Sequence, residues 1–274
     1  MGFTCLKWST TAWCATLALF VGLPQASAWA SDSDTVRDAL ERLRGSETGK
    51  EVLEQALRFW QLDQLNDLTS VIQAGSESKT DAVLTRRFDP NNGHETRERS
   101  VLVYLRLSQA PEDVVLDMAH ELVHATARAE WDPYDPLLTP GKYIHAAIEG
   151  RGGEVDAVAT ECHVAFELYP ERAQTLSRCS GYLAAGTLSK EKVREDFYRV
   201  GKWMPELKLK LGSEMSLFPV LQGSPPKLYS STGHAPYPVA LFREYSELTR
   251  VACENSRRRA PASIPDAFLT KRCQ

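Results

Sequence analysis

The sequence of 274 residues lacks features that would place it across a membrane or on nucleic acid. Beyond residue 28, no apolar run approaches the roughly 20 residues that a membrane-spanning helix needs. Acidic residues (36) outnumber basic ones (32), so the chain has no basic field of the kind that favours nucleic acid. No CxxC spacing is present, which disfavours zinc held by cysteines. We therefore expect neither stable membrane insertion nor a nucleic-acid partner.

Residues 1–28 have the pattern of a secretory signal. Lys7 precedes an apolar run from Ala12 to Leu23, which is followed by Pro24 and the small residues of 26–28. A charge, an apolar stretch and a small-residue site in this order are typical of a signal peptide. We predict cleavage after Ala28, a secreted or periplasmic protein, and a single domain over residues 29–274.

Four cysteines follow the expected leader, at Cys162, Cys179, Cys253 and Cys273. An even number of cysteines in an exported chain suggests two disulfides, and four cysteines permit three pairings. We favour Cys162 with Cys179 and Cys253 with Cys273, because each bond would close a local loop.

Helical patterns dominate the sequence. Apolar residues recur at helical spacing from Asp34 to about Gln73, whereas residues 82–88 and 100–107 resemble two strands joined by a long polar connection. These strands predict a small antiparallel pair, and a long loop is expected between Gly212 and Pro238. Further helices are predicted over residues 142–149, 154–169, 171–184, 189–204 and 239–254. The sequence thus predicts an α+β fold that is mostly helical.

Residues 120–124 (HELVH) form an HExxH motif inside an expected helix. Histidines four residues apart lie on one helix face, so both can offer a ring nitrogen to one metal ion. Glu121 projects beside the same point, where it can accept a proton from a water. The motif predicts that His120 and His124 bind a metal and that Glu121 is a general base.

The context of the motif supports a buried helix. Apolar residues recur three or four positions apart, as on the side of a helix that faces the core, and Pro111 fits the first helical position. The preceding strand would lie beside the metal, where an unpaired edge can bind an extended peptide through main-chain hydrogen bonds. The apolar stripe comprises Val115, Met118, Leu122 and Ala125.

A catalytic zinc usually has three protein ligands, and three acids compete for the third place. Glu130 stands where the extended metzincin motif has its last ligand, but that motif needs a glycine where this chain has Ala127. Glu149 precedes a glycine-rich break. Glu154 is favoured, because it opens a helix just after two glycines that allow close approach to the motif helix.

Together, HELVH (120–124) and EVDAVA (154–159) resemble the two-helix signature of gluzincin-type zincin metallopeptidases. The resemblance covers about residues 100–168. It implies a zincin-like fold, one zinc ion per chain held by His120, His124 and Glu154, and Glu121 as general base. Some members have an acid four residues after the third ligand, where this chain has Val158. Three other acids are candidates for orienting a histidine instead: Asp117, Asp156 and Glu161.

The resemblance implies a zinc metallopeptidase that acts on a peptide or protein substrate, and the signal pattern predicts that it is exported. Residues 29–99 would be an N-terminal scaffold, 100–170 the metal-binding core and 171–274 a C-terminal helical part. Two alternatives remain open: a zinc amidase acting on a cell-wall component, and a metal-stabilised binding protein without activity. The reaction also needs a donor for the oxyanion. The candidates are Tyr143, His145, Tyr198, His234 and Tyr237.

Overall fold

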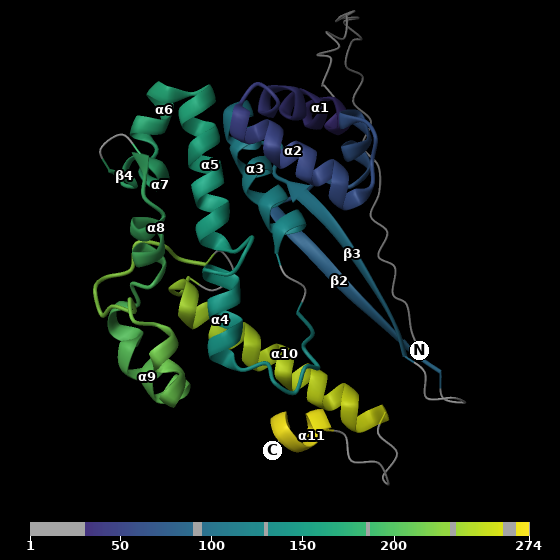
Figure 1. Ribbon diagram of the computed structural model, residues 1–274, viewed down its shortest axis with the longest axis vertical. Coiled ribbons are helices and arrows are strands. Elements are labelled where there is room, and N and C mark those ends of the chain that lie inside the picture. The colour runs from purple at the N-terminus through teal and green to yellow at the C-terminus, as the bar shows by residue number, and fades with distance from the viewer. Residues whose placement is uncertain are drawn as a thin grey trace, which may run out of the picture. The chain divides into compact units, whose positions relative to one another are not determined.

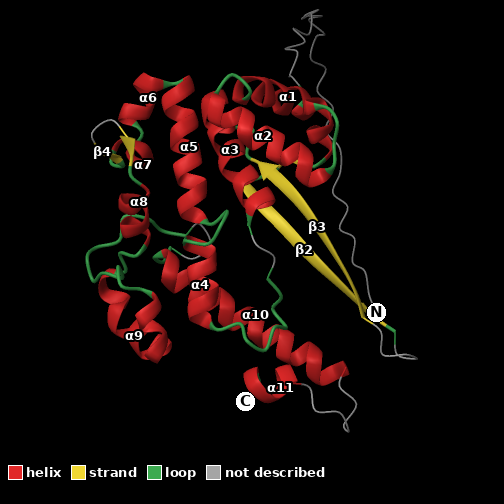
Figure 2. Ribbon diagram, viewed as in Figure 1, coloured by secondary structure: helices red, strands yellow, loops and turns green. Residues whose placement is uncertain are grey.

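The computed structural model describes residues 31–89, 95–128, 131–184, 187–230, 234–259 and 267–273. These residues are mostly helical and include a three-stranded sheet, which confirms the predicted α+β class (Figures 1 and 2). The chain from Ser31 onward forms one compact unit. None of the helices in these ranges combines the length and apolar character that crossing a membrane requires. The expected leader lies outside the described residues.

The three strands are arranged in the order β1-β3-β2. The predicted pair is present, because β2 (Lys79–Phe88) and β3 (Glu95–Leu105) run antiparallel. The third strand, β1 (Ile72–Ala74), pairs in parallel with β3. The sheet is therefore mixed rather than purely antiparallel, and the segment up to Gln73 is not helical throughout. A strand of three residues is too short to show an alternating pattern.

Strands β2 and β3 are longer than predicted, so the connection between them is shorter than expected. It spans residues 89–94, of which 90–94 lie outside the described residues. The extra length comes from charged and polar residues, which continue the pairing as a ribbon without an apolar pattern (Figure 2).

Two helices at the start of the described chain pack against the centre of the unit. Helix α1 (Asp32–Leu43) is capped by Ser31 and helix α2 (Glu47–Trp60) by Ser46, and each serine side chain accepts a hydrogen bond from a main-chain NH of the first turn. Such caps satisfy donors that the helix leaves unpaired. The apolar faces of both helices are buried: Val36, Ala39, Leu40, Leu43, Val52, Leu53 and Ala56.

Helix α3 (Pro111–Ala127) carries the HExxH motif and lies between helix α5 (Glu154–Leu168) and the β2–β3 pair (Figure 1). Pro111 occupies the first turn, as predicted. All four residues of the predicted apolar stripe are buried. Because α3 is covered by the core on one side, its polar side is fixed toward α5.

The second half of the chain is more broken than predicted. The helix expected over residues 171–184 is two short helices followed by a strand, and Leu176 between them has an extended backbone. The helix expected over 189–204 ends at Phe197, and Gly201, where a 3-10 helix begins, has a φ of 55° that does not belong to a right-handed helix. Short helices also lie in the expected loop and near the chain end.

The remaining elements are these: α4 (Pro140–Ile148), α6 (Pro170–Thr175), α7 (Ser177–Ser180), α8 (Lys190–Phe197), α9 (Met204–Leu211), α10 (Tyr237–Arg259) and α11 (Ala267–Arg272), the 3-10 helices η1 (Leu65–Ser70), η2 (Gly201–Trp203) and η3 (Gly212–Leu217), and the strands β4 (Leu183–Ala184) and β5 (Thr187–Leu188).

Both predicted disulfides are present. Cys162 of α5 is bonded to Cys179 of α7, and Cys253 of α10 is bonded to Cys273 after α11. Each bond joins a long helix to a short helical segment that follows it in the chain. Two disulfides are typical of proteins that fold in an oxidising compartment.

Candidate metal site

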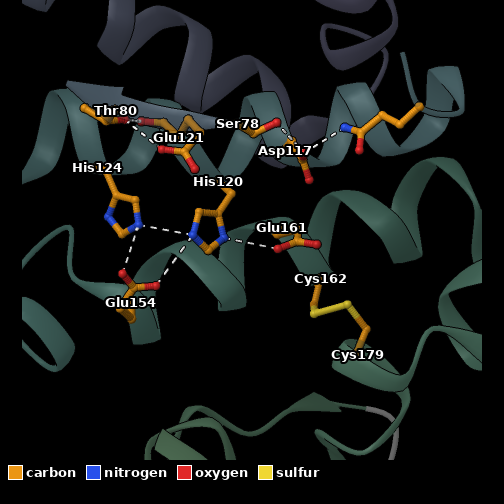
Figure 3. A network of polar contacts seen from close by, with 11 residues as sticks. Ser78, Thr80, Asp117, His120, Glu121, His124, Glu154, Glu161, Cys162 and Cys179 are labelled. Carbon is orange, nitrogen blue, oxygen red and sulfur yellow. Dashed lines mark hydrogen bonds and ion pairs between the residues drawn. A yellow bond between two sulfur atoms is a disulfide. The ribbon is translucent and has the colours of Figure 1, made fainter. Parts of the chain in front are cut away.

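The two histidines of α3 project from one face of the helix toward α5. Their Nε2 atoms lie 3.1 Å apart, and both side chains are largely buried (Figure 3). This placement follows from their spacing of four residues, which puts one ring a turn above the other. The motif therefore presents two nitrogen atoms to a single point.

Glu154, the first residue of α5, faces the same point. Its carboxylate oxygens lie 3.7 Å from the Nε2 atom of His120 and 3.6 Å from that of His124 (Figure 3). The close approach depends on Gly152, whose φ is 69° and whose added Cβ would lie 2.4 Å from the main-chain nitrogen of Arg128. Only a glycine combines this backbone conformation with this contact.

The other ring nitrogen of each histidine is held by an oxygen acceptor. The Nδ1 atom of His124 donates to the carbonyl of Gly152 at 2.8 Å, and that of His120 donates to Oε2 of Glu161 at 3.1 Å. In a neutral imidazole with its proton on Nδ1, Nε2 is an acceptor. When both rings are neutral, the two Nε2 lone pairs face each other, an arrangement that a shared cation stabilises.

The spacing of these atoms fits a metal ion. At ligand distances of about 2.0–2.2 Å, the ligand atoms of a tetrahedral site lie roughly 3.3–3.6 Å apart; here the two Nε2 atoms are 3.1 Å apart, and each lies 3.6–3.7 Å from a different oxygen of Glu154. All three ligand atoms lie within 4.8 Å of one another. The three residues therefore form a group that can hold a metal ion.

Charge within the group favours a cation. Burial opposes the charged form of His120, but the carboxylates of Glu154 and Glu161 outweigh this effect and raise the pKa of His120 well above its ordinary value. Burial likewise opposes ionisation of Glu154, yet His124 and His120 hold the pKa of Glu154 far below its ordinary value. A buried carboxylate that stays ionised attracts positive charge to the imidazoles.

Glu121 lies beside the two histidines but is held by the sheet. The hydroxyl of Thr80 on β2 lies 2.9 Å from Oε2 of Glu121 and 2.8 Å from its carbonyl oxygen (Figure 3). Burial raises the pKa of Glu121, and the histidines and Thr80 partly offset the rise. A higher pKa makes this carboxylate a better proton acceptor near neutral pH.

The structure distinguishes among the acids that were candidates for the third ligand or for orienting a histidine. Glu149 accepts a hydrogen bond from the Tyr198 hydroxyl at 2.7 Å and lies 3.5 Å from Arg194, so its partners are not the two histidines. Glu130 lies outside the described residues. Of the acids predicted to orient a histidine, Glu161 contacts His120. Asp117 and Asp156 instead accept hydrogen bonds from other groups.

Of the five predicted oxyanion donors, Tyr237 borders the cavities on both sides of Glu154. Burial and the charges of Glu154, Glu121 and Glu161 raise the pKa of Tyr237, so its hydroxyl keeps its proton. Tyr143 and Tyr198 are engaged by Glu244 and Glu149, and the two histidine candidates are exposed: His145 and His234.

Sequence reasoning missed three polar residues near the motif. Thr80 precedes the predicted strand, and Ser78 and Gln109 lie in loops, where polar side chains are common. Ser78 and Gln109 both donate to Asp117, at 2.6 Å and 2.7 Å. No local signal distinguishes these residues, because their roles depend on the packing of β2 against α3.

Comparisons with protein-family models, curated protein sequences and solved structures found no significant match. The function is therefore argued from the chemistry of the site.

Proposed function

We propose that this protein is a zinc-dependent hydrolase of peptide bonds, with zinc held by His120, His124 and Glu154. One observation carries this proposal: both Nδ1 atoms contact oxygen acceptors, so the Nε2 atoms of the neutral rings, 3.1 Å apart beside the Glu154 carboxylate, are the atoms that can bind a metal ion. Three protein ligands leave a fourth position open, as in catalytic zinc sites.

Zinc bound here would acidify a water molecule and polarise the carbonyl of the bond to be cleaved. Glu121 accepts the proton of the water and delivers it to the leaving nitrogen. The carbon–nitrogen bond breaks, the hydroxyl remains on the new carboxyl group, and the proton ends on the new amine. Thr80 keeps the Glu121 carboxylate directed at the site during both transfers.

Two further side chains complete the proposed chemistry. The Tyr237 hydroxyl donates a hydrogen bond to the oxygen that becomes negative during the reaction. Glu161 accepts a hydrogen bond from Nδ1 of His120, which fixes the ring orientation and makes Nε2 more basic.

Strand β2 supports a peptide as the substrate. The free edge was expected on the strand before the motif helix, but that strand, β3, is central in the described sheet, and β2 is an edge strand instead. Residues 80–82 of β2 border the cavity that contains His124 and Glu154. Main-chain groups of an edge strand can pair with an extended peptide. A substrate bound this way would lie across the ligands with its backbone held in register.

We further propose that the protein is exported and acts in a secreted or periplasmic location. The order of residues in 1–28 and the two disulfides support this location.

The test combines metal analysis with hydrolysis of a denatured protein such as casein. We expect about one zinc per chain, activity that is lost with a chelator and restored by zinc, and a Glu121→Gln variant that keeps the metal but loses hydrolysis. Glu171→Gln, an exposed change of the same kind on α6, is the control. Equal turnover by Glu121→Gln would refute the mechanism.

The same test separates the two alternatives. Cleavage of isolated cell-wall material but not casein would indicate an amidase. Retention of zinc with no turnover on either material would indicate a binding protein.

A further inference from the structure

The cavity beside the ligands continues on both sides of them. On one side, a cavity of about 650 Å³ borders His120 and reaches Asp113 near the start of α3. On the other, a cavity of about 370 Å³ borders His124 and reaches Arg128 after the end of α3. Both are lined by Glu154 and Tyr237, so the two cavities adjoin at the candidate metal site.

A third cavity extends this path beneath the β2–β3 ribbon. Its volume is about 880 Å³, and it shares Ala82, Arg99 and Trp131 with the cavity beside His124. The ribbon is held over this space at its far end, where Arg97 pairs with Asp132 at 2.7 Å. The groove therefore runs well past the ligands on the His124 side.

The part of the groove that follows α3 and holds the ligands sets the length of the segment that pairs there. Asp113 and Arg128 are 15 residues apart, which is about 22 Å along a helix. An extended peptide rises about 3.3 Å per residue, so roughly six or seven residues fit along α3. The chain follows α3 from Ser78, just before β2, beside Asp117 to Thr80 of β2 beside Glu121, so β2 supplies the edge for pairing.

On the His120 side, the charged side chains next to the ligands are already paired within the protein. Asp117 accepts hydrogen bonds from Ser78 and Gln109, and Arg172 pairs with Asp113 at 2.6 Å. An enzyme that removes terminal residues needs a charge that binds the terminal ammonium or carboxylate close to the metal. Engaged side chains and a groove open on both sides do not fit that requirement.

We propose, on the basis of the proposed function, that this site cleaves internal peptide bonds within an extended segment of about six or seven residues. The substrate class is an unfolded or loop segment of a polypeptide, and neither chain end is required. The reaction consumes one water and yields two shorter peptides.

The experiment uses the zinc-loaded protein and a cleavage sequence identified by mass spectrometry of digested casein. Peptides with acetylated and amidated ends are shortened stepwise around that bond from about ten residues to two. We expect kcat/KM to rise at least about tenfold up to six or seven residues and then to level off, because each added residue pairs with the groove until it is filled. A plateau at three residues or fewer, or a need for a free end, would overturn the inference.

The two faces of the ribbon provide a matched pair of variants. Arg99 pairs with Leu84 on the face that lines the groove, whereas Arg87 lies on the opposite face, exposed and paired with Glu98. Arg99→Gln should lower kcat/KM on the longest peptide by about two- to tenfold, the range that one hydrogen bond accounts for. Arg87→Gln removes the same charge and should change nothing. Equal effects of the two changes would count against the groove.

This experiment distinguishes failure of the inference from failure of the proposed function. If denatured protein is cleaved only from its ends, the internal-cleavage inference fails and the hydrolase proposal stands. If zinc is bound and no peptide of any length is cleaved, the hydrolase proposal itself fails.

Discussion

Replacing Glu161 by glutamine tests how the site orients its ligands. The Oε2 atom of Glu161 lies 3.1 Å from Nδ1 of His120, and only 2% of this side chain is exposed. Glutamine keeps the shape and an acceptor oxygen but loses the charge, so the hydrogen bond to His120 becomes weaker. We expect the variant to fold and to bind zinc more weakly.

The expected loss follows from the burial of this contact. Because Glu161 is screened from solvent, water cannot replace the carboxylate. We therefore expect the full loss of zinc affinity that removing an orienting group causes. Such groups contribute about 10- to 100-fold to metal affinity, which corresponds to about 1.4–2.8 kcal/mol. Competition with a chromophoric chelator measures the zinc dissociation constant directly. Glu171→Gln serves as the control, because this residue is exposed on α6.

The result that would refute this reasoning is a zinc affinity of Glu161→Gln within about twofold of the unaltered protein. Thermal unfolding monitored by circular dichroism shows whether the fold is retained. A variant that unfolds early would be replaced by Glu161→Asp, which keeps the charge and should retain more affinity than Glu161→Gln only if charge is what matters.

Three other predictions concern catalysis, backbone and cross-links. Tyr237→Phe should lower kcat by about a hundredfold or more, the loss typical of a removed oxyanion donor, while zinc affinity measured by the same competition stays constant; an unchanged kcat would exclude the donor role. Gly152→Ala should lower both the melting temperature and the zinc content, because the added Cβ meets main-chain atoms at a φ of 69°; a variant as stable as the original would contradict this account. Replacing both Cys253 and Cys273 by alanine should lower the free energy of unfolding by about 3 kcal/mol, measured in urea, since the bond closes a loop with a sequence separation of 20. Zinc content should not change, because that bond joins α10 to the residue after α11 and involves neither α3 nor α5. A loss of zinc would show that the C-terminal segment supports the site.

Local sequence patterns predicted the elements that hold the candidate ligands. The four-residue spacing of the histidines, the apolar stripe of α3 and the glycines before Glu154 each act within one or two turns of chain. The disulfides were also predictable, because both join cysteines that are close in sequence. These features depend on helix geometry and short loops, which are encoded locally.

Other features depend on contacts between distant segments and were not predictable. Strand β1 is defined by its pairing with β3, and Thr80 acquires its role only when β2 packs against α3. The choice of Glu161 over Asp117 depends on which face of α5 meets His120. The sequence restricted this choice to three acids, and only the packing of the two helices selects one.

The contact between Thr80 and Glu121 has a consequence for folding. Side chains alternate along a strand, so a shift of the β2–β3 pairing register by one residue would turn Lys79 or Asp81 toward α3. Such a chain could still bury most of its core and bind metal, yet a charged group would replace the hydroxyl beside Glu121. Refolded preparations can therefore contain a well-ordered but inactive fraction, and turnover per bound zinc reports strand alignment more sensitively than spectroscopic measures of folded content.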